Sequence, residues 1–135
     1  MAVAYNKFQG FVGYLGLTAN LNTDTFNVYV TNNAPSAAAD DVRGDLAGAT
    51  EENGYAAADI TNTYSEAAGT GTMGATDVVI TATGAVGPFR YVVIYDDTIA
   101  LDPLMCWWDY GSSISLADGE TFTIDFVDNA IMTLA

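Results

Sequence analysis

The feature that most constrains the fold is an alternation of apolar and polar side chains with a period of two residues. It occurs in short runs, which are separated by residues typical of turns. The run at 25–31 is the clearest, with Phe26, Val28 and Val30 on one side and polar residues or tyrosine on the other. Because successive side chains of a β-strand point to opposite faces of a sheet, this pattern predicts a half-buried strand. The sequence Asn-Asn-Ala-Pro at 32–35 predicts the loop that ends it.

Further runs of the same kind follow along the chain. They predict strands at residues 61–64, 77–83, 89–95, 103–110, 121–127 and 131–134, the first of them an edge strand. The runs at 89–95 and 103–110 carry apolar side chains on both faces, which predicts central strands covered on both sides. This spacing is typical of an antiparallel β-sandwich or jelly roll, and a chain of 135 residues suits a single domain spanning 1–135.

Two segments near the N-terminus break the strand pattern. Apolar residues from Phe8 to Leu15 recur at i, i+3, i+4 and i+7, so a short helix is expected within residues 8–17. Residues 37–49 predict one or two helical turns, with acidic residues in the first turn, where the helix dipole favours them. The expected fold is therefore mainly β, with one or two short helices near the N-terminus.

Two glycine-containing segments match known motifs only in their letters. Residues 69–74 read G-x-G-x-x-G, a motif that binds a pyrophosphate when a strand precedes it and a helix follows. Here a strand pattern follows instead, so a flexible loop is expected. Residues 111–115 begin like the G-x-S-x-G elbow of hydrolases but lack its last glycine, and a turn is expected there.

The charge of the chain is strongly unbalanced. Seventeen Asp and Glu stand against three Lys and Arg, namely Lys7, Arg43 and Arg90, for a net charge of −14 at pH 7. Binding to nucleic acid or to anionic lipid requires clustered cations, so the composition predicts no nucleic-acid partner and no membrane partner. The same charge keeps copies of the chain soluble at high local concentration.

Residues that could carry catalysis are scarce. The chain has no histidine, which excludes Ser-His and Cys-His catalysis as well as histidine metal sites. Its single cysteine, Cys106, lies in an apolar run and is expected to be buried. Acids at 96–102 and 125–129 lack the spacing of a calcium-binding EF-hand and are expected to be solvated turn acids. The sequence predicts no enzyme, no cofactor and no metal ion.

The N-terminal sequence MAVAYNKFQG lacks the basic region and long apolar core of a secretory signal. No run of apolar residues approaches the ~18 that a membrane-spanning helix needs. The protein is therefore expected to be made, and to fold, in a reducing cytoplasm.

Aromatic side chains are the main candidates for contacts with a partner. Trp107 and Trp108 are adjacent in a predicted strand, so they point to opposite faces and only one can fill a given core. The other is expected to be covered by a loop, a helix or another protein. Arg90 stands between aromatics and is expected to pair with an acid such as Asp96 or Asp109. The interface candidates are Trp107, Trp108, Tyr91, Arg90, Tyr29 and Phe11.

Sequence stretches such as GPFRY at 87–91 and WWDYGSS at 107–113 resemble those of a family of small virion structural proteins of tailed bacteriophages and prophages, and the resemblance covers most of the chain. The C-terminal half is the more specific part, and the N-terminal half adds shorter stretches. The matching stretches are GPFRY at 87–91, YDD at 95–97, DPL at 102–104, WWDYGSS at 107–113, DGETF at 118–122, DTF at 24–26, NNAP at 32–35 and ENGY at 52–55.

This resemblance implies a structural role without a catalytic motif. It suggests a capsid decoration or cement protein that binds the major capsid protein on the outer surface of the virion, made in the host cytoplasm and assembled as a homo-oligomer, a dimer or trimer. A minor tail protein is a second possibility. A carbohydrate-binding β-sandwich, in which Trp107 or tyrosines stack on sugar, is a third.

Overall fold

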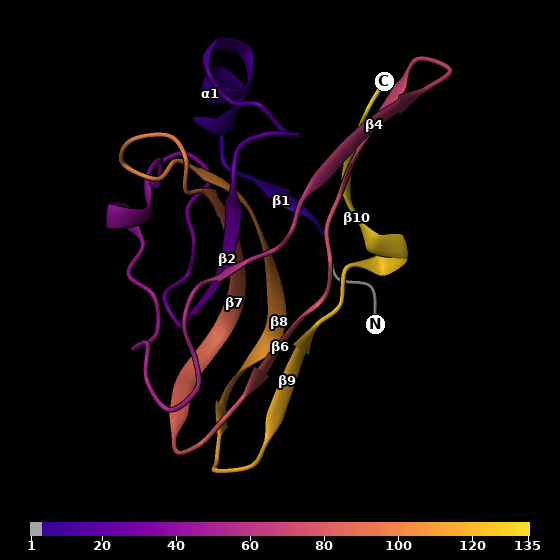
Figure 1. The fold of residues 1–135 in the computed structure, drawn as a ribbon. Coiled ribbons are helices and arrows are strands. Elements are labelled where there is room, and N and C mark those ends of the chain that lie inside the picture. The colour runs from indigo at the N-terminus through magenta and orange to yellow at the C-terminus, as the bar shows by residue number, and fades with distance from the viewer. Residues whose placement is uncertain (1–3) are drawn as a thin grey trace.

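The protein is mainly β, with several antiparallel sheets and one short α-helix near the N-terminus, consistent with a β-sandwich. The computed structural model describes residues 4–135 (Figure 1). Residues 1–3 lie outside the described residues. They belong to the expected domain 1–135 and to the N-terminal segment that is expected to lack a secretory signal.

The first layer is a five-stranded antiparallel sheet in the order β1-β8-β7-β2-β3. Two long strands, β7 and β8, pair with each other, and β2 pairs with β7 on its other side (Figure 1). This arrangement makes β7 the central strand. The strands are β1 (Asn6–Lys7), β2 (Phe26–Thr31), β3 (Ala58–Asp59), β7 (Val86–Asp96) and β8 (Leu104–Leu116).

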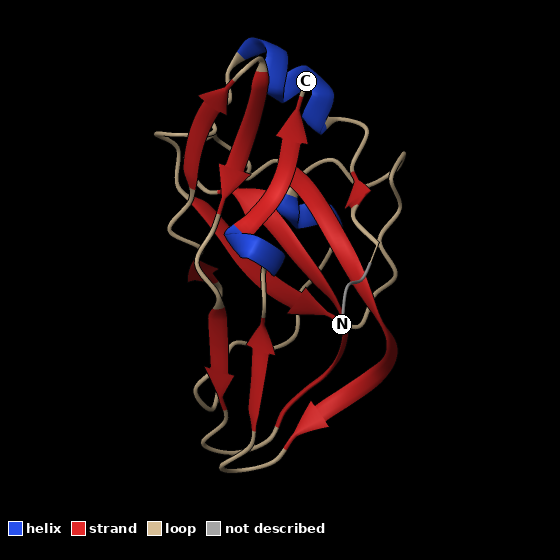
Figure 2. Cartoon of the chain, turned by 90° about the vertical axis from the view of Figure 1, so that its right-hand side faces the viewer, coloured by secondary structure: helices blue, strands red, loops and turns tan. Residues whose placement is uncertain are grey.

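The second layer consists of two smaller sheets, which lie toward the viewer in Figure 2. One has the order β10-β5-β4 and the other is the pair β6-β9. Their strands are β4 (Thr63–Ala67), β5 (Thr70–Gly74), β6 (Val78–Thr81), β9 (Thr121–Ile124) and β10 (Ala130–Leu134).

The main core lies between these two layers. Val28 and Ile94 of the five-stranded sheet belong to the same buried cluster as Met73, Ile80 and Ile124 of the smaller sheets. Removing apolar surface from water stabilises the fold by about 25 cal/mol per Å². The contact between the layers is therefore the main source of stability.

The opposite face of the five-stranded sheet is covered by the long connection at residues 32–57. Tyr29, Val93 and Tyr95 of the sheet form a second buried cluster with Leu46 of this connection. The sheet is thus buried on both faces, which confirms the prediction for 89–95 and 103–110.

The connection lies close against the sheet because of a glycine. The backbone N–H of Ala49 donates to the carbonyl oxygen of Val30 at 2.8 Å. A Cβ added at Gly48 would come within 2.8 Å of the Tyr29 ring, so only glycine fits at this distance.

Most predicted elements are confirmed, with shifted ends. The strands expected at 25–31, 77–83, 89–95, 103–110, 121–127 and 131–134 are β2, β6, β7, β8, β9 and β10. The edge strand expected at 61–64 is β4, which begins at Thr63 and lies at the edge of its sheet. The expected helix is α1 (Phe11–Leu17), and Phe8 is buried against the five-stranded sheet before the helix begins.

The prediction of a flexible loop at 69–74 was wrong. Residues Thr70–Gly74 form β5, which lies between β4 and β10. Met73 anchors this strand in the core. A Cβ added at Gly71 would collide with the hydroxyl of Tyr64 on β4, so the glycine allows the tyrosine to cross the neighbouring strand.

The helical turns expected at 37–49 reduce to one 3₁₀ turn, η1 (Arg43–Asp45). Apart from the bonds that close this turn, several backbone groups of the segment bond to the strands and loops beside it. The N–H of Arg43 donates to the carbonyl oxygen of Asp102 at 2.9 Å, for example. A second 3₁₀ turn, η2 (Val127–Asn129), precedes β10.

Residues 111–115 form no turn, contrary to the prediction, because β8 continues through them. Tyr91 pairs with Asp109, whereas Phe89 pairs with Ile114, so β8 holds extra residues between these pairs. Such a bulge bends a strand without ending it. Gly111 lies in it with φ of 99°, a conformation that favours glycine.

Two glycine substitutions test these backbone conformations. Gly111→Ala is expected to lower the free energy of unfolding by about 1 kcal/mol, because alanine is strained at positive φ. Gly13→Ala is expected to raise it by about 0.5–1 kcal/mol, because Gly13 lies within α1 and has open space around it. Urea denaturation followed by tryptophan fluorescence measures both, and shifts of the same sign would contradict the assignment.

Candidate binding surface

The structure places two of the six interface candidates inside the protein. Tyr29 is 0% exposed and Phe11 is 2% exposed. Tyr29 packs under the connection at 32–57, and Phe11 packs against Phe26 at a ring separation of 6.3 Å. Tyr29 cannot reach a partner in this fold. Phe11 is almost completely buried, although it contributes to the lining of a small groove.

Arg90 and Tyr91 lie in the middle of β7 and are partly exposed. Arg90 donates to both carboxylate oxygens of Asp109 on β8, at 2.8 and 3.0 Å. This bidentate pair confirms one of the two expected partners and excludes Asp96. The carboxylate of Asp109 accepts hydrogen bonds from Arg90 and from the backbone N–H of Gly111, and both bonds lower the pKa of Asp109. The pair holds the bulge of β8 and leaves Arg90 with no unpaired charge.

The two tryptophans lie on opposite faces, as predicted, and both are partly exposed. Trp107 packs against Phe8 with ring centroids 4.5 Å apart and belongs to the second buried cluster. Trp108 lies on the face of the main core, with Tyr5 at 5.9 Å and Phe126 at 6.0 Å. Of the two, Trp108 lines an open groove.

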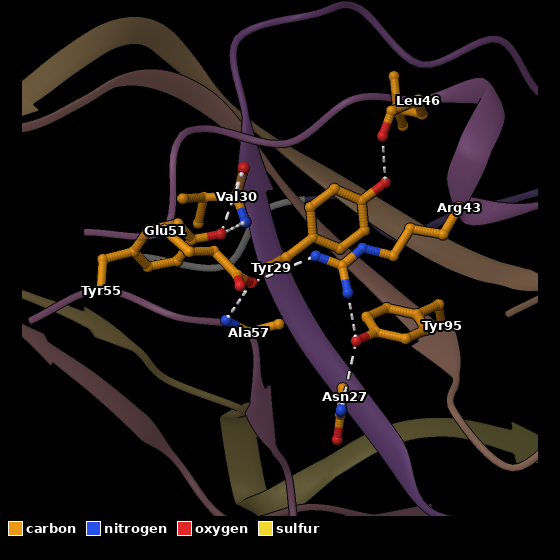
Figure 3. Close-up of polar contacts among 9 residues, drawn as sticks. All are labelled: Asn27, Tyr29, Val30, Arg43, Leu46, Glu51, Tyr55, Ala57 and Tyr95. Atoms are coloured by element: carbon orange, nitrogen blue, oxygen red, sulfur yellow. Dashed lines mark hydrogen bonds and ion pairs between the residues drawn. The ribbon is translucent and has the colours of Figure 1, made fainter.

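The richest set of polar contacts surrounds Arg43 of η1 (Figure 3). The guanidinium lies between two rings of the five-stranded sheet, 4.8 Å from the centroid of Tyr29 and 4.6 Å from that of Tyr95. It donates to the hydroxyl oxygen of Tyr95 at 2.6 Å and to a carboxylate oxygen of Glu51 at 3.2 Å. Glu51 also accepts the N–H of Ala57 at 2.7 Å.

Tyrosine hydroxyls complete this cluster. Tyr29 donates to the carbonyl oxygen of Leu46 at 2.9 Å, and the hydroxyl of Tyr55 accepts the N–H of Val30 at 2.9 Å. Burial raises the pKa of Tyr55 to about 12. Because these groups bond to one another across the connection and the sheet, the cluster fastens the two together.

A groove of about 520 Å³ lies where the second layer changes from one small sheet to the other. Trp108 and Tyr110 of β8 form one wall. The segment from β9 through η2 to β10 forms the opposite wall. The lining side chains are mostly aromatic or aliphatic, with one carboxylate: Tyr5, Val92, Trp108, Tyr110, Phe122, Thr123, Ile124, Asp125, Phe126, Val127, Ala130 and Ile131.

A second groove, of about 300 Å³, continues along the same side and shares Tyr5 with the first. It lies between α1, β1 and β10. Tyr5 forms the boundary between the two grooves, and its hydroxyl group lies 3.6 Å from the sulfur of Met132. The other lining residues are Lys7, Phe11, Val12, Leu15, Thr133 and Leu134.

The two grooves are lined mainly by apolar side chains, and the charged groups among the lining residues are Asp125 in the larger groove and Lys7 in the smaller one. Cys106 is 0% exposed, and burial raises the pKa of its thiol. No group of three or more potential metal ligands occurs among residues 4–135. The grooves therefore offer apolar surface with single charged groups among the lining residues, an arrangement that suits the binding of a partner.

Comparison of the chain with protein-family models, with curated proteins and with solved structures gave no match. The resemblance to virion structural proteins therefore stays a prediction from the sequence. In the part of the chain that the structure describes, no helix has the length and apolar character needed to cross a membrane.

The contacts of Arg43 predict that replacing this one partly exposed residue destabilises the protein strongly. Arg43→Ala is expected to lower the free energy of unfolding by about 2–3 kcal/mol, because it removes two cation–π contacts and a charged hydrogen bond to Tyr95. Arg90→Ala is the matched control and should cost much less, because the Arg90 side chain is more exposed than that of Arg43 and lies over one ring instead of two. Equal losses in urea denaturation would contradict this role for Arg43.

Asp96 differs from the solvated turn acid expected at this position. It is 0% exposed, and its Oδ1 accepts the N–H of Thr98 at 2.9 Å. Burial raises the pKa of Asp96 to about 6, the Thr98 N–H opposes this shift, and the nearby carboxyl of Asp24 adds to it. The folded protein then binds this proton more tightly than the unfolded chain, so stability falls as pH rises from about 4 to about 6.

Asp96→Asn is expected to remove this loss. The variant should match the wild type near pH 4 and exceed its free energy of unfolding by about 2–3 kcal/mol near pH 7, because asparagine carries no buried charge. Asp97→Asn, at an exposed neighbouring position, is the control and should show no such divergence. A variant that is less stable than the wild type near pH 7 would contradict the prediction.

Proposed function

We propose that this protein is a bacteriophage virion structural protein, a capsid decoration or cement protein that binds the major capsid protein on the outer surface of the shell. The observation that carries the proposal is the pair of apolar grooves along one side of a β-sandwich whose polar clusters serve stability. The sequence resemblance supplies the biological setting.

The charge of the chain supports this location. A protein with a net charge of −14 is repelled by packaged nucleic acid and favours an outer surface. On a shell, many copies bind side by side, so a contact that is weak for one copy becomes strong for an oligomer. A dimer or trimer of this chain would use that effect, and we include homo-oligomerisation in the proposal.

The carbohydrate-binding alternative now involves a different tryptophan. Trp107, the side chain expected to stack on sugar, packs against Phe8, whereas Trp108 and Tyr110 line the larger groove beside Asp125. Aromatic rings with a nearby carboxylate also occur in sugar sites, so a carbohydrate-binding module remains an alternative. A tail location remains the alternative within the virion.

Binding to capsids lacking this chain tests the proposal. The purified protein is expected to co-sediment with such capsids at a saturating ratio, and cryo-electron microscopy should show sandwich-shaped density on the outer lattice. A monomeric protein that fails to bind these capsids would overturn the proposal. Density confined to the tail would support the tail alternative, and binding on a glycan array without capsid binding would support the carbohydrate alternative.

A further inference from the structure

Exposed apolar side chains concentrate along the side of the sandwich that carries the two grooves. Eight large hydrophobic residues are exposed among residues 4–135, and five of them line a groove. Contiguous exposed apolar surface of this kind marks sites of interaction. The five are Tyr5, Val12, Tyr110, Val127 and Leu134.

The charges around the grooves are arranged unequally. Asp125 lines the larger groove and is exposed, and Asp128 follows it in η2. Arg43 and Arg90 are each paired with an acid elsewhere, so neither neutralises this end. Lys7 lines the smaller groove. The larger groove therefore combines an apolar floor with an anionic edge, and the cation lies at the other end.

From this arrangement we infer that the larger groove binds a segment of a partner protein that carries apolar side chains next to a Lys or Arg. The apolar side chains pack between Trp108, Tyr110 and Val127, and the base lies against Asp125. Aromatic and aliphatic pockets with a charged rim are the usual anchor points of protein interfaces. Identifying the partner as the capsid shell protein rests on the proposed function.

A second copy of this chain fits the larger groove poorly. Every copy carries 17 acids and only three basic side chains, and the two arginines are already paired. Placing another copy against Asp125 would bring like charges together, which costs free energy unless a counter-charge is present. A basic partner relieves that repulsion, and a self-contact increases it. Homo-oligomerisation, where the proposed function needs it, is assigned to another face.

Short peptides test the inference without any virion component. The first probe is a capped peptide of sequence lysine-phenylalanine-valine-tyrosine-lysine, and the second has glutamate in place of both lysines. In amide NMR spectra of the full chain, the basic peptide is expected to shift resonances of Tyr110, Phe122 and Val127. It should bind at least about tenfold more tightly than the acidic peptide. No groove shifts, or equal binding of both peptides, would overturn the inference.

Variants with matched controls locate the site. Val127→Glu places a charge in the groove, and Val79→Glu makes the same change at an equal exposure of 56% outside both grooves. Asp125→Lys reverses the charge in the groove, and Asp118→Lys does so at an exposed turn. The groove variants are expected to lose at least about tenfold in affinity for the basic peptide, and the controls less than about twofold. Equal losses in both sets would overturn the inference.

The same proteins separate this inference from the proposed function. If the basic peptide binds in the groove but capsids do not bind, the groove is established and the capsid proposal fails. If capsids bind equally well with Val127→Glu, the capsid proposal stands and the groove is not the contact. If analytical ultracentrifugation shows a dimer that Val127→Glu dissociates and Val79→Glu does not, a second copy occupies the groove and the inference is overturned.

Discussion

The structure depends on one constraint, which is that the five-stranded sheet is apolar on both faces. β7 carries buried side chains on each face, so neither face can be left in water. The two small sheets cover one face with the main core, and the connection at 32–57 covers the other. A chain of this size has few elements to spare, so a segment with little regular structure serves as the second cover.

A cover without regular structure needs specific bonds, and Arg43 provides them. A helix pairs its backbone groups internally and a strand pairs them with a neighbouring strand, whereas this connection bonds to the sheet through Tyr29, Tyr95 and the backbone at Ala49. Glycine at position 48 allows the close approach. Two of the three basic side chains, Arg43 and Arg90, form ion pairs with Glu51 and Asp109, so most of the remaining charges of the chain are acidic.

The groove arises because the second layer is divided. β9 and β10 belong to different sheets, and the chain between them passes through the η2 turn beside β8. Some apolar residues that a continuous second layer would cover line an open groove instead, among them Tyr110 and Val127. The division of the layer therefore explains both the location of the groove and its apolar character.

The sequence by itself determined the positions of most strands, the excess of acidic residues and the absence of histidine chemistry, because alternation and composition are local properties. It predicted that Trp107 and Trp108 face opposite ways but could not say which lines a groove. Only the tertiary structure decided that, because Phe8 covers Trp107 while the break between β9 and β10 leaves Trp108 beside open space. The same holds for Tyr29 and for β5, since burial beneath a distant segment and pairing between distant strands leave no local pattern.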